Sequence, residues 1–146
     1  MTTATQIFAN YLDGHGITYR IEDERVLSVT SKGDNAPKIR VLFIFGEGGK
    51  DVAIRCYSVA KVPSEKVAKA HETCSKLNSK YRWIKFYVDS DNEIAAEDDA
   101  VIEPNTLGAE CFELLARCIN IVDEAYPAIM GTIWGIGEGV SAPQKR

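Results

Sequence analysis

The stretch from Lys38 to Leu77 constrains the fold of this 146-residue chain more than any other. Starting at Ile39, every second residue through Phe45 is apolar, and the same spacing resumes along 52–56 after a glycine-rich turn. Two alternating segments joined by a short glycine turn predict an antiparallel hairpin with one buried face. Val62 and Pro63 then begin a segment in which apolar residues recur at helical spacing. The stretch therefore predicts a hairpin followed by a helix, and it contains no catalytic motif.

The same two periodicities predict the other elements. A first helix covers residues 4–13 and ends at Gly14, His15 and Gly16, because glycine tolerates the left-handed conformation that stops a helix. Four further strands are expected over Ile17–Ile21, Val26–Thr30, Ile84–Val88 and Glu93–Ile102. The order of elements is α-β-β-β-β-α-β-β-α, which predicts an α+β domain with a mostly antiparallel sheet and helices packed on it.

The last predicted helix is the longest. We expect Asn105 or Thr106 to cap it, because both side chains can accept hydrogen bonds from free backbone N–H groups. Its buried stripe is predicted to consist of Leu107, Cys111, Leu114, Cys118, Ile121, Val122 and Ala125. Pro127 is expected to kink or break the helix and to leave a second piece through Ile129 and Trp134.

Length and charge bound the class of protein. The chain has the length of one domain, which we expect over residues 1–134, followed by a flexible tail over 135–146. A net charge of −4 argues against non-specific binding of nucleic acid or anionic lipid. The N-terminus has no basic region followed by an apolar core, and the longest apolar run, Val41–Phe45, is too short to span a membrane. We therefore expect a cytoplasmic location and no membrane partner.

The four cysteines and two histidines do not form a recognisable catalytic or metal site. Cys56, Cys74, Cys111 and Cys118 each replace an apolar residue in a periodic pattern, and none forms a Cys-x-x-Cys pair. We expect them to be buried and reduced. His71 and Cys74 can share a helical face, but a zinc site needs about four such ligands. The sequence predicts no enzymatic activity, no metal and no cofactor.

The residues of the sheet that point away from the core form the candidate site. Because side chains alternate across a strand, the neighbours of the buried residues must face the other way. The candidate interface residues are Arg40, Leu42, Ile44, Arg55, Tyr57, Trp83, Lys85 and Tyr87. An apolar and aromatic patch with arginine at its rim is typical of protein interfaces. Two alternatives remain open: the last helix or its 129–134 piece covers this face, or the face stacks nucleic-acid bases, against which the acidic balance stands.

The order of elements and several motifs resemble the YbjN family of bacterial sensory-transduction regulators, which is related in fold to the small chaperones of type III secretion. The resembling features are the strand Ile17–Ile21 after a helix, the hairpin Lys38–Val59, the Val62-Pro63 helix start, Leu77-Asn78, the aromatic strand Trp83–Val88, and Asp123–Pro127 in the last helix. The resemblance covers roughly residues 5–134. The family has no catalytic residues to transfer, so the resemblance implies a non-enzymatic role in protein binding or regulation.

The sequence thus predicts a protein-binding or regulatory module of secretion-chaperone-like fold, with unidentified protein partners. We also expect a homodimer, because the strand 38–45 offers apolar residues to both faces of the sheet and a second copy can bury the face that the helices leave. The competing hypothesis is a small-ligand sensor with a pocket between the helices and the sheet.

Overall fold

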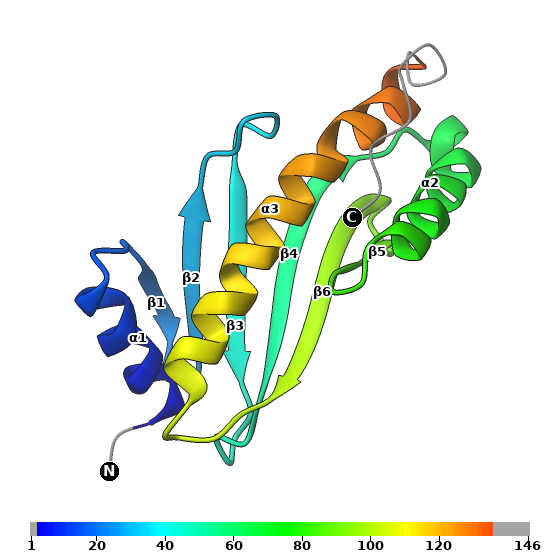
Figure 1. The fold of residues 1–146 in the computed structure, drawn as a ribbon. Coiled ribbons are helices and arrows are strands. Elements are labelled where there is room, and N and C mark those ends of the chain that lie inside the picture. The colour runs from blue at the N-terminus through cyan, green and yellow to red at the C-terminus, as the bar shows by residue number, and fades with distance from the viewer. Residues whose placement is uncertain (1–2, 136–146) are drawn as a thin grey trace.

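The computed structural model describes residues 3–135, and its elements follow the predicted order with one added 3₁₀ turn (Figure 1). The helices are α1 (Ala4–Gly14), α2 (Val67–Lys80) and α3 (Leu107–Trp134), and the 3₁₀ turn before α2 is η1 (Ser64–Lys66). The strands are β1 (Arg20–Asp23), β2 (Val26–Ser31), β3 (Ile39–Phe45), β4 (Asp51–Lys61), β5 (Lys85–Val88) and β6 (Glu93–Val101). The predicted α+β class is confirmed. The tail expected over 135–146 lies outside the described residues, apart from Gly135.

The six strands form one antiparallel sheet in the order β1-β2-β3-β4-β6-β5. The predicted hairpin is the β3–β4 pair, in which Phe43 lies opposite Ile54 and Phe45 opposite Val52. All four side chains are almost fully buried, so the core face of the hairpin is the predicted one. The chain then passes through α2 to the edge strand β5 and returns as β6, which lies between β5 and β4.

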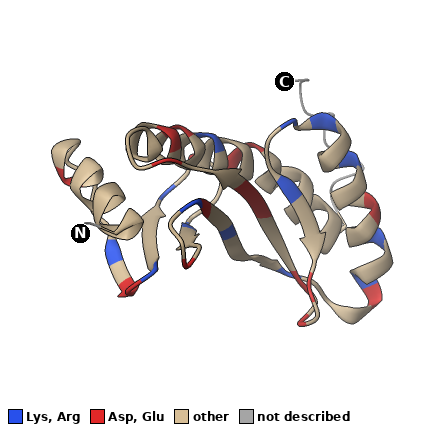
Figure 2. Ribbon diagram, turned by 90° about the horizontal axis from the view of Figure 1, so that it is seen from below, with Lys and Arg blue, Asp and Glu red and all other residues tan. Residues whose placement is uncertain are grey.

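All three helices pack against one face of this sheet (Figures 1 and 2). α3 crosses β3 and β4, with α1 beside its first half and α2 beside its second half. The core fills the space between the helices and the sheet, where the rings of Phe8 and Phe43 lie 4.7 Å apart. Ile129, near the end of α3, is fully buried in this core. The alternative in which the last helix covers the second face of the sheet is therefore wrong.

α3 runs through Pro127 as one continuous helix, so the expected break is absent. Proline lacks the N–H group that would donate to the carbonyl of Asp123, four residues earlier. That carbonyl instead accepts a hydrogen bond from Asn35 Nδ2 at 3.1 Å. A side chain from the β2–β3 loop thus satisfies the carbonyl that the proline leaves free.

Two further details of α3 differ from the prediction. Leu115 is buried and Leu114 is only half-buried, because the buried stripe continues four residues beyond Cys111 and not three. Thr106 is the N-cap residue, but its side chain does not accept from the backbone. Its hydroxyl donates to Glu110 Oε1 at 3.0 Å instead.

The first strand begins at Arg20 and not at Ile17 as predicted. α1 ends in a Schellman motif, in which Ile17 N–H donates to the carbonyl of Leu12 at 3.0 Å and Gly16 N–H donates to that of Asp13 at 3.2 Å. Gly16 has a φ of 69°, the left-handed conformation that this motif needs. Ile17 packs back onto the core as part of the helix end, so it does not enter the sheet.

Candidate functional site

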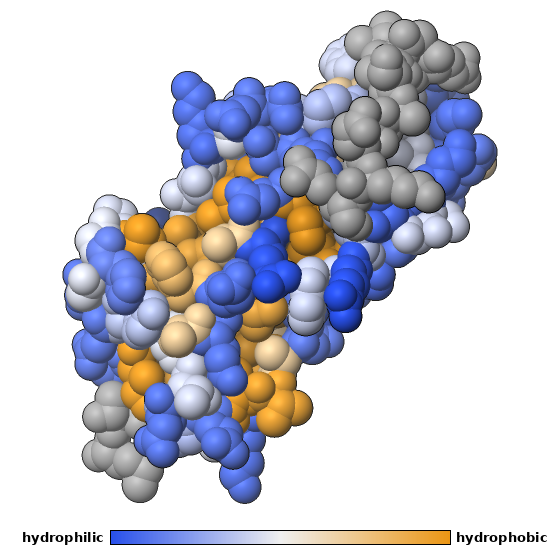
Figure 3. Space-filling view, in the orientation of Figure 1, coloured by the Kyte–Doolittle hydropathy of each residue, from blue (hydrophilic) through white to orange (hydrophobic). Residues whose placement is uncertain are grey.

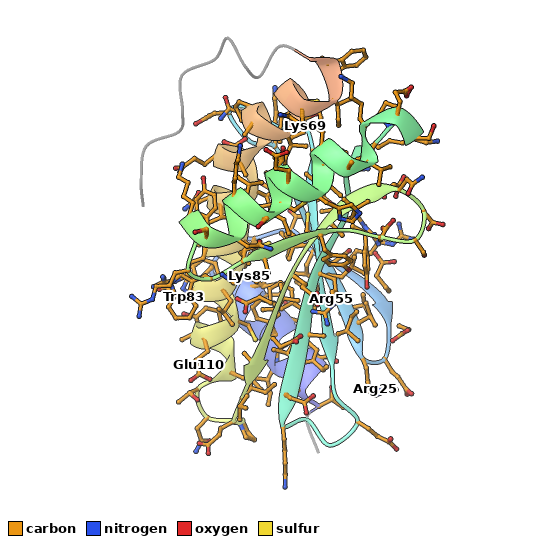
Figure 4. The ribbon with its side chains drawn as sticks, turned by 90° about the vertical axis from the view of Figure 1, so that its right-hand side faces the viewer. Arg25, Arg55, Lys69, Trp83, Lys85 and Glu110 are labelled. Carbon is orange, nitrogen blue, oxygen red and sulfur yellow. The ribbon has the colours of Figure 1, made fainter. Side chains whose placement is uncertain are left out.

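The sheet face opposite the helices is left bare by residues 3–135, and we call it the open face. Its residues include Glu22, Val26, Ser28, Thr30, Arg40, Leu42, Ile44, Ala53, Arg55, Tyr57, Tyr87, Ala95, Glu97 and Asp99. Figure 4 shows Arg55 on the side of the sheet away from α3. The opposite surface, which carries the helices, shows hydrophobic residues along α3 and beside α1 among hydrophilic ones (Figure 3).

An aliphatic strip runs across the central strands of the open face. Val26 lies opposite Ile44, which in turn lies opposite Ala53 on β4. Leu42 lies between Ser28 on β2 and Arg55 on β4. The apolar members of this strip are half-buried although no described helix covers them. Their remaining exposed area is apolar surface that a bound partner would remove from water.

A first group of charges borders the strip on the side of β1. Glu22 accepts a hydrogen bond from the hydroxyl of Ser28 and another from Arg40 Nη2, both at 2.7 Å. Arg20 Nε lies 3.6 Å from the same carboxylate. The Ser28 hydroxyl and the Arg40 guanidinium hold the pKa of Glu22 below its ordinary value, so the carboxylate stays charged at neutral pH.

A second group of charges borders the strip on the side of β6. Arg55 Nη1 lies 2.9 Å from Asp99 Oδ1, and Arg55 Nη2 lies 3.2 Å from Glu97 Oε2. Arg55 Nη1 also donates to the backbone carbonyls of Ile54 and Asp98, both at 3.0 Å. The Arg55 guanidinium is thereby held between β4 and β6 by four oxygen partners.

Two tyrosines extend the open face beyond Arg55. Tyr57 is 46% exposed, and Tyr87 is half-buried. Tyr87 lies opposite Ala95, which is fully buried although it belongs to this uncovered face. Burial raises the pKa of Tyr87. Large rings with a polar tip at the edge of an aliphatic strip are the residues that interfaces favour.

The structure brings six of the eight predicted residues together and places two elsewhere. Trp83 precedes β5, and its ring centroid lies 4.7 Å from the guanidinium of Arg117 on α3, so it belongs to the helix layer. Lys85 starts β5 opposite Glu97 of the open face, but its ammonium group reaches away and donates to the carbonyls of Tyr81 at 2.8 Å and Asn78 at 3.1 Å, at the end of α2. Figure 4 shows both residues on the side of α3 and α2. Alternation predicts a face only within a strand, and Trp83 lies outside one.

The carboxylates and the serine of the open face were missed by the sequence analysis. The alternation that placed Arg40 and Arg55 on this face also places four other residues there, because side chains at every second strand position point to the same side. These residues are Glu22, Ser28, Glu97 and Asp99. They were passed over because polar residues on a strand are ordinarily read as solvated. In the structure they hold the arginines in place.

A cavity of about 280 Å³, which we call the fork pocket, lies at one end of the open face. Its lining includes Lys38, which precedes β3, Arg40 and Leu42 on β3, Tyr57 on β4, and Tyr126 on α3. Residues of two sheet strands and of α3 therefore line the same pocket.

The cysteines lack the chemistry of a nucleophile. All four are buried and free. Burial raises the pKa of Cys56 and of Cys74 to about 11 and that of Cys111 to about 12, and it raises the pKa of Cys118 further. Thiols with such pKa values are uncharged at neutral pH, and the thiolate is the reactive form. Among residues 3–135 no three His, Cys, Asp or Glu side chains are grouped to hold a metal ion.

A helix that is long and apolar enough to cross a membrane does not occur in the described part of the chain.

Fold and surface together define a class of small α+β domain, with helices on one side of an antiparallel sheet and a surface of interface composition on the other. A family model described as "YbjN: Putative bacterial sensory transduction regulator" matches residues 5–130. The chain therefore belongs to the YbjN family.

Two solved structures share the fold. One is described as "YbjN, a putative transcription regulator from E. coli"; it is 13% identical, covers 80% of this chain and 87% of its own, and has a TM-score of 0.57. The other is a chain of the heterodimeric complex ExoU–SpcU from the type III secretion system of Pseudomonas aeruginosa; it is 12% identical, covers 85% of this chain and 95% of its own, and has a TM-score of 0.54. The predicted likeness to YbjN and to a type III secretion protein is thus confirmed at the level of fold. A search of curated proteins finds no match to this chain.

Proposed function

We propose that this chain is a non-enzymatic protein-binding module of the cytoplasm whose open face binds a second copy of the same chain. The observation that carries the proposal is the one-sided placement of the helices, which leaves an aliphatic strip with tyrosine and arginine neighbours bare on the other side of the sheet. Four buried thiols are consistent with a reducing compartment.

Charge favours a second copy as the occupant of the open face. The two ion-pair groups contain three arginines and three carboxylates: Arg20, Arg40, Arg55, Glu22, Glu97 and Asp99. The chain as a whole carries a net charge of −4, so two copies repel one another over most of their surface. On the open face the opposite charges balance, and a twofold axis can bring the arginines of one copy near the carboxylates of the other. A stable dimer would bury more than about 1,000 Å² in total.

Family and fold support a regulatory role through protein contacts. The family is described as a sensory transduction regulator, and the ExoU–SpcU neighbour is a complex of two different proteins. We propose that the dimer of this chain likewise presents a surface to a further protein.

Light scattering coupled to gel filtration tests the dimer. We expect a mass of twice 16.1 kDa at micromolar concentrations. Ile44→Asp, which places a charge in the aliphatic strip, should yield a folded monomer, with folding checked by circular dichroism. The matched control is Ala116→Asp, which adds the same charge at an exposed position on α3 and should remain dimeric. A wild-type mass of one chain at every concentration, or a dimer that survives Ile44→Asp, would refute self-association through the open face.

A small-ligand sensor is the second candidate function. The fork pocket favours it, because strand residues and α3 residues together line a concave site of the kind that holds small ligands.

A further inference from the structure

The pairing of β3 with β4 stops partway along both strands. The last pair is Leu42 with Arg55, although β3 begins at Ile39 and β4 continues to Lys61. The neighbouring strands remain attached beyond this point, since β2 pairs with β3 to its first residue and β6 pairs again with Ala60 and Lys61 after a register shift. The two strands therefore diverge as a fork inside an otherwise continuous sheet.

The backbone of β4 shows why the fork opens. Ser58 has a φ of 56°, a left-handed conformation that is rare for residues other than glycine, asparagine and aspartate. The β4–β6 register shifts between Cys56 and Ala60, so extra residues of β4 bulge out of the ladder. The Ser58 hydroxyl donates to Glu93 Oε1 at 2.7 Å and ties the bulge to β6. β-Bulges and non-glycine residues with a left-handed backbone conformation are both enriched at functional sites.

The fork pocket occupies the space between the diverging strands. Leu42, Val59 and Val122 give it apolar walls, and Val122 and Tyr126 of α3 close it from the helix side. Its volume of about 280 Å³ corresponds to about nine water molecules at ~30 Å³ each. This is close to the lower end of the size range of small-molecule pockets, about 300 Å³.

The polar groups of the fork pocket are cationic or hydroxylic. Lys38 and Arg40 line it, and no carboxylate does. Arg40 is paired with Glu22, but Lys38 has no ion-pair partner among residues 3–135. The hydroxyls of Tyr57 and Tyr126 have no hydrogen-bond partner within the same range, so both remain available as donors. The pocket thus offers one free positive charge and two phenolic donors around an apolar interior.

We propose that the fork pocket binds a small organic acid that carries one aromatic or branched aliphatic group and one carboxylate. The apolar group enters between Leu42, Val59 and Val122, and the carboxylate meets Lys38 at the rim with a tyrosine hydroxyl as second donor. The pocket shares Arg40, Leu42 and Tyr57 with the open face, but the proposal does not depend on dimerisation.

A nuclear magnetic resonance titration of the ¹⁵N-labelled full chain tests the proposal, with phenylacetate as the probe. We expect saturable shifts of backbone amides in 56–59 and 122–126. Phenylethylamine reverses the charge of the probe and acetate removes its ring, so each should produce less than a tenth of the shift at equal concentration. Each titration is run on the wild type and on Ile44→Asp, the variant expected to be monomeric. Shifts seen only in the variant would show that a dimer covers the pocket in the wild type. Absence of shifts in both proteins, equal shifts with phenylethylamine, or shifts elsewhere in the chain would overturn the proposal.

A matched pair of variants tests whether the positive charge of Lys38 binds the carboxylate of the ligand. Lys38→Glu should weaken phenylacetate binding at least tenfold. Lys32→Glu makes the same change at an exposed position in the same loop that does not line the pocket, and it should bind as the wild type does. Equal binding by the two variants would show that Lys38 does not hold the carboxylate. A carboxylate beside an aromatic ring can come from a free small acid or from a segment of a peptide, and the peptide acetyl-Asp-Phe-amide distinguishes the two. Saturation by the peptide, without saturation by phenylacetate, would overturn the proposal of a small acid in favour of a peptide segment.

Discussion

The side-chain amide of Asn35 donates to the backbone carbonyl of Asp123 at 3.1 Å and satisfies the group for which Pro127 has no N–H. In return, the Asp123 carboxylate accepts from the backbone N–H groups of Asp34 at 3.0 Å and of Asn35 and Ala36, both at 2.8 Å. A Cβ at Gly33 would collide with this carboxylate, so the loop needs glycine there. We call this set of contacts the Asp123 clamp. It fastens the β2–β3 loop to the middle of α3.

The Asp123 clamp should be visible in both stability and its dependence on pH. Partial burial raises the pKa of Asp123, but the three backbone donors outweigh that effect and hold the pKa below the ordinary value of 3.8. The carboxylate therefore stabilises the fold fully above that value, and the contribution is lost as the pH falls through the lowered pKa. Asp123→Asn should reduce the free energy of unfolding by about 1–3 kcal/mol at pH 7. Chemical denaturation between pH 7 and pH 3 should show the gap to the wild type closing in acid.

The control for the clamp is Asp34→Asn in the same loop. Asp34 contributes only its backbone N–H to the clamp, so the substitution should change stability by less than about 0.5 kcal/mol. Equal losses of stability in the two variants would mean that removing any negative charge near this loop has the same effect, and that the clamp makes no specific contribution.

Gly108 on α3 should resist enlargement. A Cβ at this position would lie 2.6 Å from Tyr11 Cδ2 and 2.9 Å from Tyr11 Cγ, so the ring on α1 would have to move. We expect Gly108→Ala to lose about 1–2 kcal/mol in thermal denaturation, because the overpacking outweighs the helix propensity that alanine gains. Gly48→Ala, where a Cβ meets nothing within 4 Å, should leave the melting temperature nearly unchanged. A stabilised Gly108→Ala would show that α1 shifts at no cost.

Two adjacent leucines of α3 should differ in their contribution to stability. Leu115 is 4% exposed, so Leu115→Ala should lower the free energy of unfolding by about 2–5 kcal/mol. Leu114→Ala removes the same atoms from a half-buried site and should cost about 1 kcal/mol or less. Urea denaturation of both variants measures the difference, and a larger loss at Leu114 would contradict the phase of the helix.

The four thiols should be inaccessible in the native protein. Each is buried, and burial keeps each protonated at neutral pH. A thiol reagent added without reductant should react slowly with the folded chain and should count four free thiols after denaturation. Fewer than four would reveal a disulfide, and rapid reaction of the native protein would show that one of the cysteines is accessible.

The hairpin and the open face were predictable because both follow from local alternation. The register of β3 against β4 comes directly from Phe43 and Ile54 pointing to the same side. The continuity of α3 was not predictable from neighbouring residues, since the group that compensates for Pro127 is Asn35, far away in sequence. Trp83 was misplaced for a similar reason, because its partner Arg117 belongs to another element. The fork pocket depends on where pairing ends, and alternation continues unchanged through that point.

The Asp123 clamp also bears on how readily the fork pocket could receive a ligand. Ala36, a donor to Asp123, lines the pocket, and so does Val122, the neighbour of Asp123 on α3. The loop wall and the helix wall are thereby fixed to one another before any ligand arrives. A cavity with pre-set walls does not lose conformational freedom when it fills, so little of the interaction energy of a small ligand would be consumed in ordering its site. The carbonyl that Pro127 leaves without a helical partner thus takes part in the contacts that join two walls of the fork pocket.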